Sequence, residues 1–143
     1  LAEYALLTAQ RRHEPVSLAF VDLDRFKHIN DTWGHEEGDR ALIAIADLMK
    51  AAFRESDILA RQGGDEFIIL FANTSRHDAA TAMETLSHNV ARFNQQAAHP
   101  WQLAFSWGCV EYDPASHPSL NALVATADRL MYQAKQKQGR ERR

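Results

Sequence analysis

The sequence predicts a single α+β domain in which helices pack on one face of a mainly antiparallel sheet. Apolar runs of strand length alternate with longer segments whose apolar residues recur at helical spacing. Two of the strand-length runs flank a glycine pair, which is typical of a β-hairpin. After an opening helix, the expected order of elements is β-α-α-β-β-α-β-α, and this order suits such a layered fold.

Length and composition are those of one ordinary globular domain. With 143 residues, 45% hydrophobic and 24% charged, the chain can bury one substantial core, so we expect a single domain over 1–143. A formal net charge of −3 argues against a nucleic-acid partner. The lone cysteine, Cys109, excludes an internal disulfide and fits a reducing compartment. No apolar run approaches a membrane span and no signal peptide is evident, so we expect a cytoplasmic domain without membrane contact.

The first predicted elements are a helix and a buried strand. Residues 1–13 have an apolar face at helical spacing and begin without a capping residue, as though cut from a longer signalling protein. Pro15 ends this helix. Residues 16–21 form a near-continuous apolar run, as expected for a strand buried on both faces.

Two helices and the hairpin should follow. A short helix over 25–29 leads into a polar loop over 30–35, and an amphipathic helix begins at Glu37. The apolar runs 58–60 and 67–71 are the two hairpin strands.

The last part of the chain predicts a helix, a strand and a final helix. Residues 73–75 are a helix-start signal for an amphipathic segment that reaches Phe93. Residues 103–110 are of strand type, and the proline-bearing loop 112–118 leads to the last helix.

The hairpin turn ends in two adjacent carboxylates. Gly63 and Gly64 are expected to supply the positive φ angles of a tight turn, and Asp65 and Glu66 follow directly. A turn needs neither charge, and an unpaired carboxylate beside an apolar strand is costly to bury. A hard divalent cation is therefore the leading explanation for the acids.

A second acidic pair closes the first strand. Asp22 and Asp24 alternate with Leu23, so both carboxylates should project to the same side. If this strand end lies beside the hairpin, Asp22, Asp65 and Glu66 converge, and Mg²⁺ would relieve their repulsion while using substrate phosphates as further ligands. Taken separately, the first pair is often a helix cap with a solvated acid, and Gly-Gly-Asp is often a plain turn.

Three motifs together resemble the GGDEF family of diguanylate cyclases. They are FVDLDRFKHIND over 20–31, the pairs Gly34-His35 and Gly38-Asp39, and GGDEF over 63–67. The resemblance implies a ferredoxin-like core similar to the palm of polymerases and nucleotidyl cyclases. It also implies that two GTP condense to cyclic di-GMP with release of two pyrophosphates, one GTP being held by each subunit of a homodimer.

The resemblance assigns a metal site to the acids. Asp22 and Asp65 match metal-ligating carboxylates, and the carbonyl of Leu23 matches a further ligand. Asp65 also matches the proton acceptor for the 3′-hydroxyl, and Glu66 is expected to assist with metal or base. The implied cofactor is Mg²⁺ or Mn²⁺, with two ions per site.

The resemblance also assigns a GTP site. Asn30 and Asp39 match the residues that read guanine, and His35 matches a position beside the nucleotide. Phe26 and Lys27 match positions whose backbone amides approach the phosphates at a helix N-terminus. The plainer alternatives are a turn former for Asn30, a helix-start acid for Asp39 and a turn brace for His35.

Two departures from the family pattern concern the hairpin and the last helix. Gln62 stands where the family has an aromatic or aliphatic residue. Lys135 matches a phosphate-binding lysine and Arg140 its partner, but three residues separate Lys135 from Gly139, where the family has two. Either Lys137 substitutes or Arg140 is displaced, and a solvated basic helix end is the alternative for Lys137.

Arg54 and Asp57 match the R-x-x-D product-inhibition site of the family, placed before the glycine pair. The alternative is a helix-end arginine followed by a turn aspartate. The family's additional arginine on the next helix is not evident, since Glu84 and Thr85 occupy that neighbourhood.

Other functions remain open at this point. The domain could bind GTP or cyclic di-GMP without turnover, or serve mainly for dimerisation or partner docking. A different metal-dependent nucleotidyl transferase is a further alternative, although it would not explain the guanine-reading positions.

Overall fold

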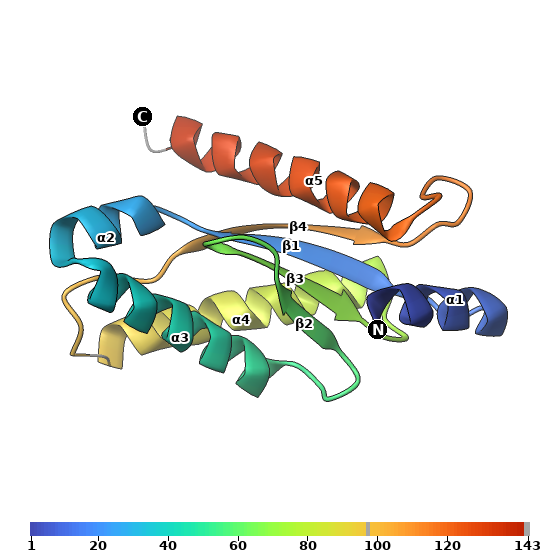
Figure 1. Cartoon of the computed structure of the whole chain (residues 1–143), viewed down its shortest axis with the longest axis horizontal. Helices are drawn as coiled ribbons and strands as arrows, with labels where there is room; N and C mark the ends of the chain where they lie inside the picture. The colour runs from blue at the N-terminus through green and yellow to red at the C-terminus, as the bar shows by residue number, and fades with distance from the viewer. Residues whose placement is uncertain (97, 142–143) are drawn as a thin grey trace.

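An antiparallel sheet forms the middle layer of the molecule, with the strand order β2-β3-β1-β4 (Figure 1). The computed structural model describes residues 1–96 and 98–141, the side chains of 140 and 141 excepted. The strands are β1 (Ser17–Leu23), β2 (Ile58–Arg61), β3 (Glu66–Phe71) and β4 (Phe105–Glu111). The helices are α1 (Ala2–Arg12), α2 (Phe26–Trp33), α3 (His35–Ala52), α4 (Arg76–Gln96) and α5 (Leu120–Glu141).

The predicted elements are confirmed to within about two residues, except around α2. Local chemistry fixes several of the boundaries. His13 adopts a left-handed conformation with φ 55° at the end of α1, two residues before Pro15. Ser75 accepts a hydrogen bond from the Asp78 amide at 3.2 Å, and Ser119 accepts one from the Ala122 amide at 3.1 Å. These two serines cap the starts of α4 and α5.

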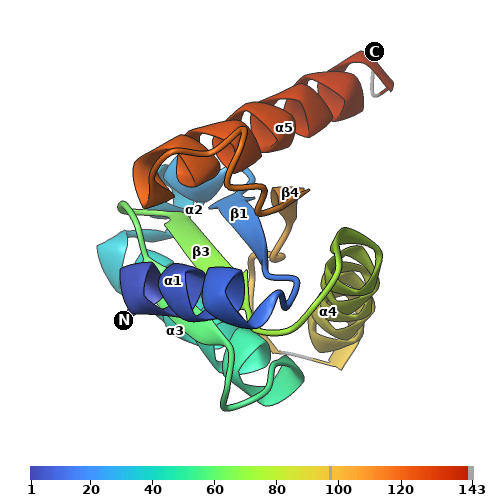
Figure 2. The ribbon, with the colours of Figure 1, turned by 90° about the vertical axis from the view of Figure 1, so that its right-hand side faces the viewer.

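Helices cover both faces of the sheet, not one face as expected (Figure 2). Alternate residues of β1 belong to two separate cores: Ala19 and Val21 pack with α3 and α4, whereas Leu18 and Phe20 pack with α5 and α1. The apolar run had already predicted a strand buried on both faces, and such a strand requires cover on each side. The one-sided arrangement was therefore wrong, and the pattern of the strand was the better guide.

The expected polar loop over 30–35 is also wrong. Helix α2 continues through Trp33, and Gly34 alone, with φ 92°, separates it from α3. Ile29 is buried in the core and the Gly34 amide donates to the Asn30 carbonyl, so tertiary packing keeps weak helix formers helical. His35 is accordingly the first residue of α3 and not a loop residue.

The hairpin glycines do not have the expected positive φ angles; among the described glycines only Gly34 does. The turn closes because the amides of Gln62 and Gly63 both donate to the Glu66 carbonyl, at 2.8 and 3.3 Å. Gly63 provides space instead, since a Cβ there would lie 2.6 Å from Glu66 Oε1. Nothing lies within 4 Å of a Cβ placed on Gly64, so this side of the turn is open.

Within the described ranges, no helix is both long and apolar enough to cross a membrane.

Candidate active site

The end of β1 and the start of β3 bring the two acidic pairs together. Asp22 pairs with Glu66 across the antiparallel register, so the two side chains share the sheet face that α5 covers. The Leu23 amide donates to the Asp65 carbonyl at 3.0 Å, which fixes the turn against the strand end. This register confirms that the end of the first strand lies beside the hairpin, which was the condition for the acids to converge.

Burial and neighbouring negative charges raise the pKa values of two carboxylates at this site. Burial, and then the negative charge of Asp22, raise the pKa of Asp65 above its usual range. Burial, followed by the charges of Asp22 and Asp65, likewise raises the pKa of Glu66. Oδ1 of Asp22 is buried without a hydrogen-bond partner among the described residues. A buried carboxylate oxygen without a donor, beside two further acids, is an arrangement that a cation would stabilise.

Lys135 of α5 supplies one positive charge to this cluster. Its Nζ lies 2.9 Å from Oδ2 of Asp22 and 3.6 Å from Oδ1 of Asp24. Burial alone would lower the pKa of Lys135, but the hydrogen bonds and charges of Asp22 and Asp24 together outweigh it and raise the pKa. Both acids of the first pair therefore face the same side, as their alternation predicted.

The residues at this strand end fit a divalent cation. Among the described residues, no three His, Cys, Asp or Glu side chains are already gathered as a metal cluster. The oxygen donors available are the carboxylates of Asp22, Asp65 and Glu66 and the Leu23 carbonyl at the same strand end. Mg²⁺ usually binds one or two protein carboxylates and completes its coordination with water and substrate phosphates.

Helices α2 and α3 bring the predicted guanine-reading positions together. The Asn30 side chain lies directly against Gly38, where any Cβ would overlap its amide group. Asp39 is the next residue and is exposed in the first turns of α3. His35, at the start of α3, is exposed as well. Gly38 thus makes room for Asn30, which the sequence alone did not indicate.

The N-terminus of α2 follows directly after the acidic strand end. Arg25 takes a left-handed conformation with φ 60°, and no side chain caps this helix. Phe26 packs partly buried against the core, whereas Lys27 is exposed. The first backbone amides of α2 are therefore not used by a capping side chain, and such amides are suited to bind phosphate oxygens.

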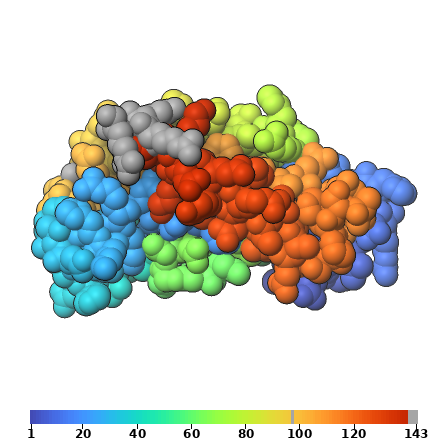
Figure 3. Space-filling model, turned by 90° about the horizontal axis from the view of Figure 1, so that it is seen from above, coloured from blue at the N-terminus to red at the C-terminus, as the bar shows by residue number. Residues whose placement is uncertain are grey.

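Surface views show how these parts meet. Seen from above, the second half of α5 lies next to α2 and to the β2–β3 hairpin (Figure 3). Lys137 on this part of α5 is exposed. Arg140 belongs to α5 by its backbone, and its side chain lies outside the described part of the chain.

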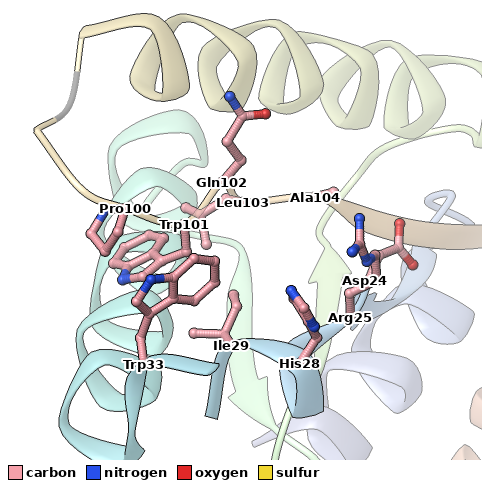
Figure 4. Close-up of a pocket in the computed structure, with 10 residues that line it drawn as sticks. All are labelled: Asp24, Arg25, His28, Ile29, Trp33, Pro100, Trp101, Gln102, Leu103 and Ala104. Carbon is pink, nitrogen blue, oxygen red and sulfur yellow. The ribbon is translucent and has the colours of Figure 1, made fainter. Parts of the chain in front are cut away.

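A cavity of about 460 Å³ lies beside the acids but does not include Asp22 or Asp65. Figure 4 shows its walls, formed by α2 and by residues 100–104 before β4. His28 and Trp33 line it, and His28 is two residues, a little over half a helical turn, from Asn30. Asn30 is not among the residues that line this cavity, and Asp24 lies at one end of it.

Sequence reasoning missed the residues that brace this side of the site. Nε1 of Trp101 donates to Glu37 at 2.7 Å and ties the segment before β4 to α3. Ser106 of β4 donates to Asp24 at 2.8 Å. Both partners are far apart in the sequence from the residues that they hold, so no local pattern could have indicated them.

Arg54 and Asp57 lie at the opposite end of the hairpin from the acids. The Arg54 guanidinium donates to Asp57 at 3.2 Å, to the Ala72 carbonyl at 2.6 Å and to Thr74 Oγ1 at 2.7 Å. Asp57 also accepts a hydrogen bond from the Ala72 amide at 3.2 Å. These contacts join the residues before β2 to those after β3, and two cavities of about 190 and 260 Å³ flank the pair.

The fold and the strand-end acids define an α+β domain with a candidate metal site at the edge of its sheet. The family model described as "Diguanylate cyclase, GGDEF domain" matches residues 2–142. The chain belongs to the GGDEF family.

Relatives with known names agree with this membership. The chain is 38% identical over 138 residues to the bifunctional diguanylate cyclase/cyclic di-GMP phosphodiesterase MucR of Pseudomonas aeruginosa, covering 96% of this chain and 20% of that protein. It is 35% identical over 134 residues to the diguanylate cyclase DosC of Escherichia coli, covering 94% of this chain and 29% of that protein. The chain thus spans between a fifth and a third of the length of these curated relatives.

Solved structures share the fold. An active GGEEF domain of a diguanylate cyclase from Vibrio cholerae superimposes with a TM-score of 0.84 at 28% identity, covering 94% of this chain and 85% of that one. The GGDEF domain of DgcB from Caulobacter crescentus, solved in complex with c-di-GMP, gives a TM-score of 0.85 at 27% identity, covering 94% and 80%. The expected α+β class with a GGDEF-type architecture is therefore confirmed.

Proposed function

We propose that this domain is a diguanylate cyclase, which joins two GTP molecules into cyclic di-GMP and releases two pyrophosphates. The carrying observation is the convergence of Asp22, Asp65 and Glu66, with one buried Asp22 oxygen left without a donor. Family membership and the names of the relatives support the same reaction. Since GTP is a cytoplasmic nucleotide, we also propose the cytoplasm as the location of the domain.

The acids would hold Mg²⁺ or Mn²⁺, as two ions, through Asp22, the Leu23 carbonyl, Asp65 and Glu66. When bound, the ions supply the positive charge that polarises the triphosphate and neutralises the leaving pyrophosphate. Asp65 accepts the proton of the 3′-hydroxyl. At the same time the oxygen of that hydroxyl forms a bond to the α-phosphorus, and the bond from this phosphorus to pyrophosphate breaks. Glu66 assists the same step as ligand or base.

The nucleotide itself would lie between α2, α3 and α5. Asp39 accepts hydrogen bonds from guanine N1–H and N2–H₂, Asn30 completes the pattern, and His35 lies beside the nucleotide. The backbone amides of Phe26 and Lys27 bind the phosphates. Lys135 binds them from α5, with Arg140 as its proposed partner, and two subunits bring two such sites face to face.

Turnover of purified protein tests the proposal. Asp65→Asn and Glu66→Gln should each lower cyclic di-GMP formation at least about a hundredfold, because each removes a charge from the reacting site while keeping its shape. The measurement is chromatography of the products after incubation with GTP and Mg²⁺. Asp47→Asn, an exposed acid on α3, is the matched control and should retain parental turnover.

Unchanged turnover in either acid variant, with a circular dichroism spectrum like that of the parent, would overturn the assignment. Binding of GTP by the parent without any product would instead favour a binding module without turnover.

We further propose product inhibition at Arg54 and Asp57. An arginine fork beside a buried carboxylate suits the guanine edge or a phosphate of cyclic di-GMP, and the flanking cavities leave room beside it. Arg54→Ala should raise the cyclic di-GMP concentration for half-inhibition about tenfold or more. Because Arg54 also ties the hairpin ends together, the melting temperature of Arg54→Ala is measured alongside. Arg92→Ala on α4, which replaces an exposed arginine, is the control. Superimposable inhibition curves for Arg54→Ala and parent would refute this site.

A further inference from the structure

Lys135 is shared between two carboxylates whose surroundings differ. Its Nζ is closer to Asp22, at 2.9 Å, than to Asp24, at 3.6 Å. Asp22 belongs to the proposed metal site, and its other oxygen is buried without a partner among the described residues. A divalent cation that takes up Asp22 would therefore compete directly with the ammonium group for that carboxylate.

Asp24, the second carboxylate beside Lys135, is held in place by β4 and the segment before it. Its side chain is only 7% exposed, and its Oδ1 accepts a hydrogen bond of 2.8 Å from the hydroxyl of Ser106. Ser106 is itself 1% exposed and comes from β4, 82 residues away along the chain. The backbone of Asp24 is fixed as well, since its amide donates to the Ala104 carbonyl at 2.8 Å.

Gln138 completes this arrangement from α5. Its side-chain oxygen Oε1 lies 3.3 Å from the Ser106 hydroxyl and can accept a hydrogen bond from it. A hydroxyl has one proton, and the shorter contact, at 2.8 Å, is to the charged carboxylate, so Asp24 is the main acceptor and Gln138 the weaker one. Gln138 is three residues from Lys135, and residues at this spacing lie on the same face of a helix.

We propose that Asp24 and Ser106 are positioning residues that keep the Lys135 ammonium group at the phosphate site once a metal ion has taken up Asp22. The inference rests on the proposed function, because it gives Lys135 the triphosphate as its eventual ligand. Asp24 stays beside the ammonium group, since Ser106 donates to one of its oxygens and the packing around the buried side chain keeps it in place. Without this partner the long Lys135 side chain, already 37% exposed, would turn to solvent when the metal binds.

Two variants test this role, with controls of the same residue type. Asp24→Asn removes the second carboxylate charge, and Ser106→Ala removes only the hydroxyl that orients it. Asp47→Asn on α3 and Ser87→Ala on α4 are the matched controls, because both residues are exposed. Ser106→Thr restores a hydroxyl and should recover most of the parental behaviour.

The first measurement follows the ammonium group of Lys135 by ¹H–¹⁵N NMR, with Lys135→Arg used to assign the signal. In the parent the signal should persist when Mg²⁺ alone is added, because Asp24 still holds the group. In Asp24→Asn it should disappear on addition of Mg²⁺. Loss of the signal in the parent, or its persistence in Asp24→Asn, would overturn the proposal whether or not the domain turns over GTP.

The second measurement is calorimetric binding of a non-hydrolysable GTP analogue with Mg²⁺. Asp24→Asn should weaken binding about tenfold or more, Ser106→Ala by less, and the controls not at all. In turnover assays both variants should raise KM for GTP more than they lower kcat, which a general loss of folding would not produce. Parental affinity in both variants would refute the role, whereas analogue binding without turnover in the parent would count against the proposed function alone.

Discussion

The two carboxylate oxygens of Asp22 have different surroundings. One of its oxygens is paired with Lys135 and the other is buried without a donor among the described residues. Structural carboxylates at such depth are normally satisfied on both oxygens. The incomplete pairing is therefore a cost to stability that a bound cation would remove, and it supports the proposed role of Asp22 as a metal ligand.

Some of these residue contacts could be predicted from the sequence and others could not. Asp22 and Asp65 each follow a recognisable strand or turn signal, so their meeting needed only one assumption about neighbouring strands. The pairs Asp24–Ser106 and Asp22–Lys135 span 82 and 113 residues and depend on the register of β4 and the docking of α5. No local spacing contains that information.

Cys109 provides a residue-scale prediction. Burial raises the pKa of its thiol to about 11, whereas the thiol is exposed in the unfolded chain. The unfolded state then loses its proton first, so this residue makes the free energy of unfolding fall as pH rises from about 9 to 11. At pH 10 the loss should be about 1 kcal/mol, measured by urea denaturation.

Cys109→Ala separates this effect from other groups that titrate in the same range. Its stability should fall less steeply between pH 9 and 11 than that of the parent. Parallel stability curves for parent and variant would contradict the prediction.

At the level of elements, α2 and the hairpin turn differ from the local sequence prediction because contacts in the folded domain outweigh local preference. Asn30, Asp31 and Thr32 favour a loop by propensity, but burial of Ile29 against the core keeps the segment helical. At the turn, the glycines were expected for their positive φ angles. Gly63 instead leaves space for the end of the Glu66 side chain, a contact that only the folded hairpin reveals.

The packing of α5 on β4 leads to a second prediction. A Cβ on Gly108 would overlap the backbone of Met131 and Ala127, and backbone atoms cannot move aside as a side chain can. Gly108→Ala should therefore lower the free energy of unfolding by about 3 kcal/mol. It should also weaken binding of a GTP analogue, because the same helix carries Lys135.

Gly139→Ala on the same helix is the control for this change. Nothing lies within 4 Å of its added Cβ, so the substitution should stabilise the protein by up to about 1 kcal/mol through helix propensity. Equal melting temperatures for the two alanine variants would show that α5 does not approach β4 as closely as described.

At the level of the whole molecule, the acids should reduce stability where they serve function. Asp65 lies close to Asp22 and Glu66, in a chain that already has a net charge of −3. Asp65→Asn should therefore raise the melting temperature of the metal-free protein by on the order of 2 °C, because it removes repulsion between like charges.

With Mg²⁺ added, the parent should have a higher melting temperature than Asp65→Asn. The parent should gain stability from the ion, by mass action, and Asp65→Asn should gain less. Calorimetric melting at low ionic strength with and without Mg²⁺ measures both effects. A variant less stable than the parent without metal would contradict the predicted repulsion.

The central position of β1 in the order β2-β3-β1-β4 has a consequence for folding. This early strand pairs with β3 and with β4, so both of its edges wait for segments synthesised much later. Sequence-distant pairing of this kind slows folding, since long loops must close before contacts form. On the ribosome, the strand that bears Asp22 therefore stays incompletely paired until β4 emerges, and the Lys135 contact comes later still. A nascent chain thus cannot assemble the contacts between the acids and Lys135 before nearly the whole domain has been made.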